Sequence, residues 1–170
     1  EAYMFGVRVG KKFNNVNMKP SIAIWYDELS GTDDDDITGN EWGTFNTLYD
    51  TGHKFYGLMD LFLNAINGGT AGLGLQDLAV KGTLTPAPGW KVKAAYHWFD
   101  TQVDPSDNAK ARGPQVGANV SSDIGTELDL SLHNKYNANT AVTLGYSYFA
   151  GEQLFNLQRQ NAGDDAEWIY

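Results

Sequence analysis

Residues 90–99, "WKVKAAYHWF", alternate strictly between two kinds of side chain. The apolar and aromatic set consists of Trp90, Val92, Ala94, Tyr96 and Trp98. The other set carries two lysines and a histidine and consists of Lys91, Lys93, Ala95, His97 and Phe99. Because successive side chains of a β-strand point to opposite faces, this pattern predicts a strand with one apolar and one polar face.

The same alternation predicts strands in five more stretches and the start of another at the end of the chain. These stretches are 3–12, 19–27, 77–85, 124–135, 141–149 and the short ending 167–170. In 124–135 the predicted apolar face runs from Ile124 through Leu128 to Leu132. The sequence therefore predicts an antiparallel all-β fold of about seven strands.

The predicted connections fall into two length classes that alternate along the chain. Short turns lie at 14–17, 86–89 and 137–139, and long polar connections lie at about 28–73, 100–122 and 151–166. Strict alternation places every short turn at one end of the strands. This asymmetry is typical of a transmembrane β-barrel, which has short periplasmic turns and long extracellular loops.

Aromatic residues support the barrel prediction, because they gather on the apolar face near both ends of the strands, as in the girdles of outer-membrane barrels. Near the long connections these are Tyr3, Tyr26, Tyr96, Trp98, Tyr146 and Tyr148, and near the short turns Phe13, Trp90 and Tyr136. A soluble antiparallel barrel or sandwich, with the apolar face as its core and exposed aromatics that bind sugars, is the alternative from another class.

Composition narrows the possible functions. A length of 170 residues predicts one domain over 1–170, and a net charge of −9 argues against nucleic acid as a partner. The sequence contains no catalytic motif, so we expect no enzyme and no cofactor. The carboxylates of Asp33–Asp36 suit Ca²⁺, but the spacing of a calcium loop is missing and such runs are more often solvated loops, so no metal site is predicted.

The longest connection contains "TLYDTGHKFYGLMD", residues 47–60, which resembles neither a strand nor an ordinary core helix. We interpret the overlapping stretch "KFYGLMDLFLNA", residues 54–65, as a short helix or folded loop, with Leu58, Phe62 and Ile66 at helical spacing. Its apolar side chains need burial, and the nearest place is the mouth of the pore. Candidate pore-mouth residues are His53, Tyr56 and Asp60.

Cationic residues concentrate toward the short turns, and most of them share the polar face, which in a barrel is the lumen. The candidate pore-lining residues are Arg8, Lys12, Lys19, Lys81, Lys91, Lys93, His97 and Lys135. A cationic lumen attracts anions such as a polyuronate. The alternative is a solvated rim in which the lysines pair with Asp77, Glu127 and Asp129. We expect His97 to be solvated and the interior, with its many small residues, to be wide and water-filled.

Three segments are similar to a known family: "FNTLYDTGHKFYGLMDLF" (45–62), "GLQDLAVKGTLTPAPGWKVKAAYHWF" (74–99) and "DDAEWIY" (164–170). They resemble the C-terminal part of the alginate-export family of outer-membrane proteins. The resemblance implies a Gram-negative outer-membrane barrel of about eighteen strands that carries an acidic polysaccharide or smaller solutes. Seven strands cannot close a barrel in lipid, so the remaining strands must come from the same or another chain.

The function predicted from these observations is an outer-membrane channel that passes an anionic, alginate-like saccharide by diffusion. A general or nutrient-specific porin of the same fold is the alternative. Expected partners are outer-membrane lipid, lipopolysaccharide and the anionic saccharide.

Overall fold

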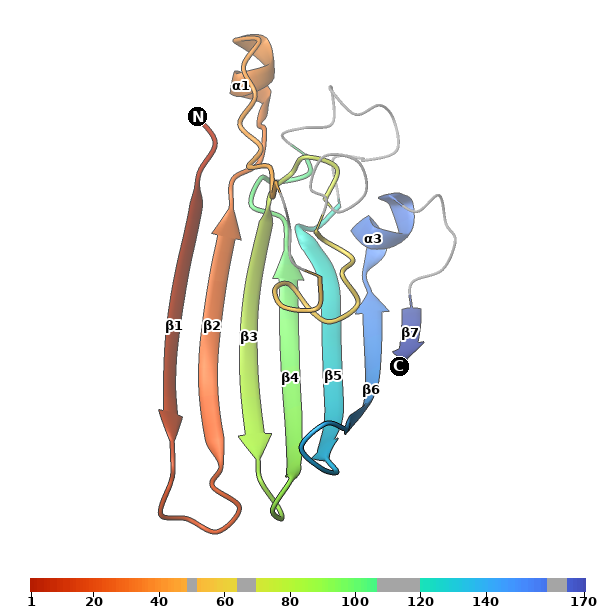
Figure 1. Cartoon of the computed structure of the whole chain (residues 1–170). Coiled ribbons are helices and arrows are strands. Elements are labelled where there is room, and N and C mark those ends of the chain that lie inside the picture. The colour runs from red at the N-terminus through yellow and green to blue at the C-terminus, as the bar shows by residue number, and fades with distance from the viewer. Residues whose placement is uncertain (49–51, 64–69, 107–119, 159–164) are drawn as a thin grey trace.

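The computed structural model describes residues 1–48, 52–63, 70–106, 120–158 and 165–170. Seven strands form one antiparallel sheet in chain order (Figure 1). They are β1 Met4–Lys12, β2 Ser21–Leu29, β3 Leu75–Leu84, β4 Trp90–Asp100, β5 Asp123–Lys135, β6 Ala141–Gly151 and β7 Asp165–Ile169. The predicted all-β antiparallel fold is confirmed. The sheet is open, with β1 and β7 at its edges, and corresponds to part of a barrel wall.

The three short turns all lie at one end of the sheet, and the long connections lie at the other, as predicted (Figure 1). The first turn is closed by a hydrogen bond from the Phe13 amide to the Pro20 carbonyl of 2.8 Å. In the second turn Gly89 has φ +81°, a value that suits glycine because it has no Cβ. We call the two ends of the sheet the short-turn end and the long-loop end.

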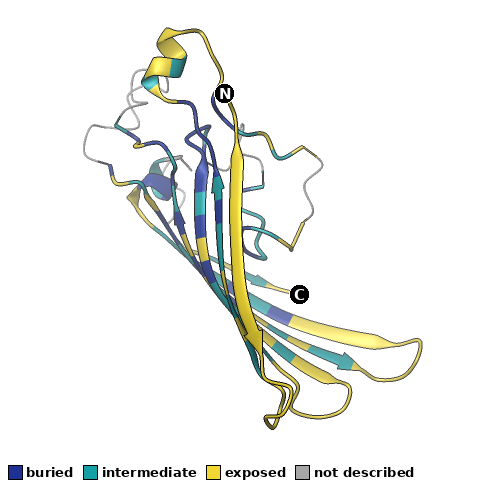
Figure 2. Cartoon of the chain, turned by 90° about the vertical axis from the view of Figure 1, so that its left-hand side faces the viewer, coloured by how far each residue is buried: buried dark blue, intermediate teal, exposed yellow. Residues whose placement is uncertain are grey.

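The two faces of the sheet differ as the alternation predicts. The outer face carries Ile22, Ile24, Leu130 and Leu144, whose side chains are 52%, 53%, 42% and 58% exposed. A broad exposed apolar surface of this kind is typical of a protein that contacts lipid and would be costly in water. The inner face is the opposite face, and the sheet is strongly curved (Figure 2).

Burial is concentrated near the long-loop end, whereas the short-turn end is exposed (Figure 2). An aromatic cluster forms the centre of this core: the Phe62 ring lies 4.6 Å from Phe99 and 5.9 Å from Phe149, measured between centroids. The remaining core residues are Leu29, Tyr56, Leu73, Leu75, Val103, Val120, Ile124, Leu154 and Phe155. The expectation of a wide, water-filled interior is therefore wrong for this half of the inner face, where segments of the long connections pack on the sheet.

Ile124 departs from the predicted face. Strands β4 and β5 shift register between Phe99 and Asp100, so that Phe99 pairs with Gly125 and Asp100 pairs with Asp123. Gly125 at this bulge has φ +141°. The bulge turns Ile124 away from the outer face and buries it completely in the core.

The described parts of the long connections contain the short helices α1 Asp34–Thr38 and α3 Gln153–Gln158. The aspartate run 33–36 begins α1, and the Asp33 side chain caps the helix by accepting a 2.8 Å hydrogen bond from the Asp36 amide. In the described ranges no helix is both long and apolar enough to cross a membrane.

Adjacent positions on β5 test the assignment of the two faces. Leu130→Arg places a cation on the outer face and should lower the free energy of unfolding by about 2–4 kcal/mol near the bilayer midplane. Ser131→Arg points to the inner face and should change it by less than about 1 kcal/mol. Urea titration of the protein in lipid vesicles, followed by tryptophan fluorescence, measures both. Equal losses would mean that both faces are buried.

Candidate functional site

Residues 52–63, which we call the inner loop, fold back from the long-loop end onto the inner face of the sheet and cross in front of β4 and β5 in Figure 1. This confirms a folded loop and excludes the predicted short helix over its described residues; Ile66 lies outside them. Four loop residues have left-handed φ angles, namely His53, Tyr56, Gly57 and Asp60 at +59°, +59°, +84° and +57°. Repeated left-handed residues reverse the chain and interrupt helical hydrogen bonding.

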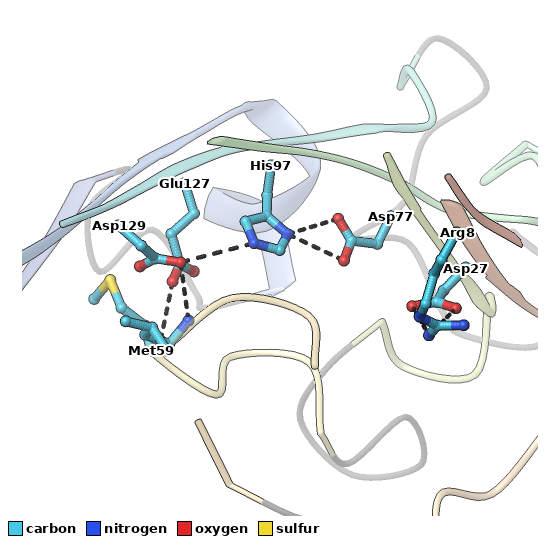
Figure 3. Close-up of polar contacts among 8 residues, drawn as sticks. Arg8, Asp27, Met59, Asp77, His97, Glu127 and Asp129 are labelled. Atoms are coloured by element: carbon cyan, nitrogen blue, oxygen red, sulfur yellow. Dashed lines mark hydrogen bonds and ion pairs between the residues drawn. The ribbon is translucent and has the colours of Figure 1, made fainter. Parts of the chain in front are cut away.

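Two carboxylates of β5 hold the tip of the inner loop. Glu127 Oε1 accepts a 3.0 Å hydrogen bond from the Met59 amide, and Asp129 Oδ2 accepts one of 3.3 Å from the Leu58 amide (Figure 3). Asp129 Oδ1 also accepts a 2.6 Å bond from the Ser147 hydroxyl. Backbone amides and buried carboxylates both require partners, and these bonds supply one to each of the two amides and to one oxygen of each carboxylate.

Gly57 permits this close approach for two reasons. Its φ of +84° is strained for other residues, and a Cβ at this position would overlap the carboxyl group of Glu127. The glycine in "YGLMD" is therefore required where the loop backbone touches the sheet.

On its polar side the loop is held by contacts between two of its own residues, His53 and Asp60. The His53 amide donates a 2.7 Å hydrogen bond to Asp60 Oδ1, and His53 Nδ1 lies 3.0 Å from Asp60 Oδ2. The His53 ring stacks on Trp168 of β7, with 4.7 Å between the centroids. Trp168 in turn stacks on Tyr170 at 4.3 Å. The loop thus bridges β5 and β7.

The apolar side of the loop anchors it to the core through Phe62 and Tyr56, which are 1% and 4% exposed. Burial, with the negative charges of Asp27 and Asp77 nearby, raises the pKa of Tyr56 to about 12. Tyr56 therefore remains a neutral phenol at physiological pH. Of the three predicted pore-mouth residues, His53 and Asp60 form a pair beside the groove described below, and Tyr56 is part of the core.

A polar chain runs across the sheet beneath the inner loop (Figure 3). His97 Nδ1 lies 2.8 Å from Asp77 Oδ1, and His97 Nε2 lies 3.7 Å from Asp129 Oδ2. All three side chains are almost completely buried. His97 lies on the inner face, as predicted, but the expectation that it is solvated is wrong, because the loop covers it.

Arg8 also has a fixed partner rather than a free position in the lumen. Its Nη2 donates hydrogen bonds of 2.6 and 2.8 Å to the two carboxylate oxygens of Asp27. The guanidinium lies 4.7 Å from the Trp25 ring, and Lys81 Nζ lies 4.3 Å from the same ring. Trp25 is therefore a cation-binding platform between β1 and β3.

Below the loop, toward the short-turn end, the inner face forms an open groove of about 780 Å³. Its cationic residues are Lys54, Lys81 and Lys93, and its large aromatic residues are Trp25, Trp168 and Tyr170. The other polar residues of the lining are His53, His133, Ser21, Thr83, Ser131, Thr143 and one carboxylate, Asp129. The groove therefore offers positive charge, flat aromatic surface and hydrogen-bonding groups, which together suit an anionic sugar chain.

The predicted pore-lining residues divide into three groups. Lys81 and Lys93 line the groove. Arg8 and His97 are held by carboxylates beneath or beside the loop. Lys12, Lys91 and Lys135 are exposed in the strands at the short-turn end, but Lys19 lies in the first turn, with φ +44°, rather than at a strand position. Within the described residues the ion pairs of Asp77 and Asp129 are with His97, so the predicted alternative that these carboxylates pair with lysines is not observed.

Sequence reasoning missed Lys54, Trp25, Trp168 and Tyr170 as groove residues. Trp25 sits at an inner position of the alternation, opposite Arg8 in register, and an aromatic residue on a polar face is a detectable signal. Lys54 enters the groove only through the fold of the loop, which alternation does not predict. The Tyr170 ring can lie over Gly145 because glycine has no Cβ, and a Cβ at this position would overlap the ring.

Within the described part of the chain, no three His, Asp or Glu side chains gather closely enough to hold a metal ion.

Gly57→Ala tests the fit between the loop and β5. The added Cβ and the left-handed φ should destabilise docking by about 1–2 kcal/mol, enough to raise the population of the undocked loop about tenfold. Trypsin should then cleave after Lys54 about tenfold faster, since cleavage follows the open population.

The matched control is Gly82→Ala. A Cβ at Gly82 meets only the Ser21 carbonyl oxygen at 3.6 Å, an ordinary contact. This variant should leave trypsin cleavage unchanged. If the two variants were cleaved at equal rates, the contact between Gly57 and Glu127 would not hold the loop.

A family model described as alginate export matches residues 1–165. No curated protein matches the chain.

Proposed function

The chain belongs to the alginate-export family, a family of outer-membrane transport proteins rather than enzymes, and from this membership we propose that its strands line a channel for an anionic polysaccharide or oligosaccharide. The saccharide diffuses along the inner face, through the groove below the inner loop. The proposed location is the outer membrane of a Gram-negative cell, where the outer face of the sheet contacts lipid and lipopolysaccharide. The strands that complete the barrel come from the same or another chain.

The groove carries this proposal, because its charged lining is mainly cationic. Lys54, Lys81 and Lys93 line it, and the one carboxylate of the described lining, Asp129, is only 3% exposed. Ammonium groups around a water-filled path attract carboxylates, and the low dielectric of the wall strengthens that attraction relative to open solution. Since each ammonium is a mobile point charge rather than a rigid fork, it can release a passing carboxylate, which conduction requires.

Aromatic side chains supply the second property that a saccharide path needs. Trp25, Trp168 and Tyr170 present apolar ring surface beside the lysines, and sugar rings have apolar C–H faces that pack on such surfaces. Ser131 and Thr143 supply hydroxyls for the sugar hydroxyls. A pore for small ions alone would not need this combination.

Neutralising the two groove lysines of the strands tests the proposal. Lys81→Gln with Lys93→Gln should weaken block of single-channel current by oligouronates about tenfold, at roughly 0.7 kcal/mol for each lost charge. The measurement is the half-blocking concentration in planar bilayers.

A control variant and a control ligand show whether the block depends on the charge of the groove. Lys11→Gln changes a cation that stacks on Phe13 beside the first turn, outside the groove, and should leave the block unchanged. Neutral oligosaccharides of equal length should block the wild-type channel much more weakly than oligouronates. Equal block by neutral and anionic chains would favour a general or nutrient-specific porin instead.

A further inference from the structure

The inner loop covers the most acidic part of the inner face. Four strand carboxylates lie under or beside it, Asp27, Asp77, Glu127 and Asp129, and their residues are 1%, 2%, 0% and 3% exposed. If the loop were absent, these groups would face the same lumen as the groove lysines. The sheet alone therefore carries an acidic inner face toward the long-loop end, although the groove below it is cationic.

The four carboxylates differ in what compensates them. Asp27 is paired with Arg8, and Asp77 with His97, so both have a partner on the sheet itself. Glu127 and Asp129 instead accept hydrogen bonds from the amides of Met59 and Leu58 in the loop. Asp129 has in addition the Ser147 hydroxyl and, at 3.7 Å, His97 Nε2. The loop backbone is thus the main feature that separates this pair of carboxylates from the lumen.

The loop also adds positive charge to the lining of the groove. It presents Lys54 and His53 to the groove. Its single carboxylate, Asp60, is 21% exposed and is engaged by His53. Docking of the loop therefore hides negative groups of the sheet and adds a positive one to the path.

We propose that the inner loop is an electrostatic mask, which makes the lumen anion-selective by covering Glu127 and Asp129 with its backbone amides. Gly57, Leu58 and Met59 then determine the ion selectivity indirectly, because they hold the loop backbone over Glu127 and Asp129. The proposal rests on the function above only in that the chain lines a channel; the identity of the saccharide does not enter.

Release of the loop has a defined electrical consequence. Once the loop is released, its backbone no longer separates Glu127 and Asp129 from the water of the lumen. The two uncovered carboxylates then offset the lysines of the narrow path, because charges within a Debye length of about 8 Å are only weakly screened. A purely steric plug behaves differently, because its removal raises conductance without changing which ion is preferred.

A double-mutant cycle on the complete channel separates these two cases. One arm releases the loop with Gly57→Val, which adds a branched side chain against Glu127 at a left-handed φ. The other arm neutralises the sheet with Glu127→Gln and Asp129→Asn, whose amide oxygens still accept from the loop. The readouts are conductance and the chloride-to-potassium permeability ratio in a KCl gradient. Replacement of 52–63 by a short Gly-Ser linker is the second way to release the loop if Gly57→Val leaves it docked.

The mask predicts a specific interaction between the arms. Loop release alone should raise conductance and lower the permeability ratio at least about threefold. Neutralisation alone should change the ratio little, because the carboxylates are already covered. Neutralisation in the released channel should restore the anion preference while conductance stays high, an outcome that loss of Lys54 from the groove would not produce.

Two results would overturn the mask. One is a released loop, shown by raised conductance and cleavage after Lys54, with an unchanged permeability ratio. The other is an equal effect of neutralisation in the docked and released channels. Failure of the proposed saccharide pathway is distinguishable from both, since it would appear as weak oligouronate block of the wild-type channel whatever the permeability ratio does.

Discussion

The hydrogen bonds between the Glu127 and Asp129 carboxylates and the backbone of the inner loop are the interactions on which the functional site depends. A carboxylate without partners is costly to bury, and so is an unpaired amide. Each group is buried here because the other satisfies it. The docked loop then covers the inner face toward the long-loop end and borders the groove toward the short-turn end. It also places Lys54 in the lining of this groove. Without these bonds the same sheet would present a different inner face.

This arrangement divides the inner face into two halves with different physical roles. Toward the long-loop end, phenylalanine rings and a buried polar chain form a core that resembles the interior of a soluble protein. Toward the short-turn end, lysines stay in contact with solvent. The bilayer requires only that the backbone groups of a strand are paired with neighbouring strands and that its outer face is apolar. The inner face can therefore be packed in one half and open in the other.

Much of the fold could be predicted from alternation, and the site could be predicted only in part. The strict pattern of 90–99 gave the correct faces for β4, because each side chain's face follows from its parity alone. Alternation predicted the wrong face for Ile124, because a bulge beside Gly125 adds a residue to the strand. It also could not predict that His97 is buried. His97 and Lys93 occupy equivalent positions in the pattern, and only the loop, brought back by four left-handed residues, distinguishes them. Such a tertiary contact between segments about 70 residues apart leaves no periodic signal.

The proposed saccharide path is solvated, positively charged and runs along the groove at Ser131. The chain contains no cysteine, so Ser131→Cys introduces a single thiol into it at that position. The measurement is the rate at which this thiol, in the reconstituted channel, reacts with anionic and cationic methanethiosulfonates, each relative to its rate with a free thiol. If the path is positively charged and binds the saccharide, the anionic reagent should have the faster relative rate and oligouronates should protect the thiol. A faster relative rate for the cationic reagent, or no protection, would contradict it.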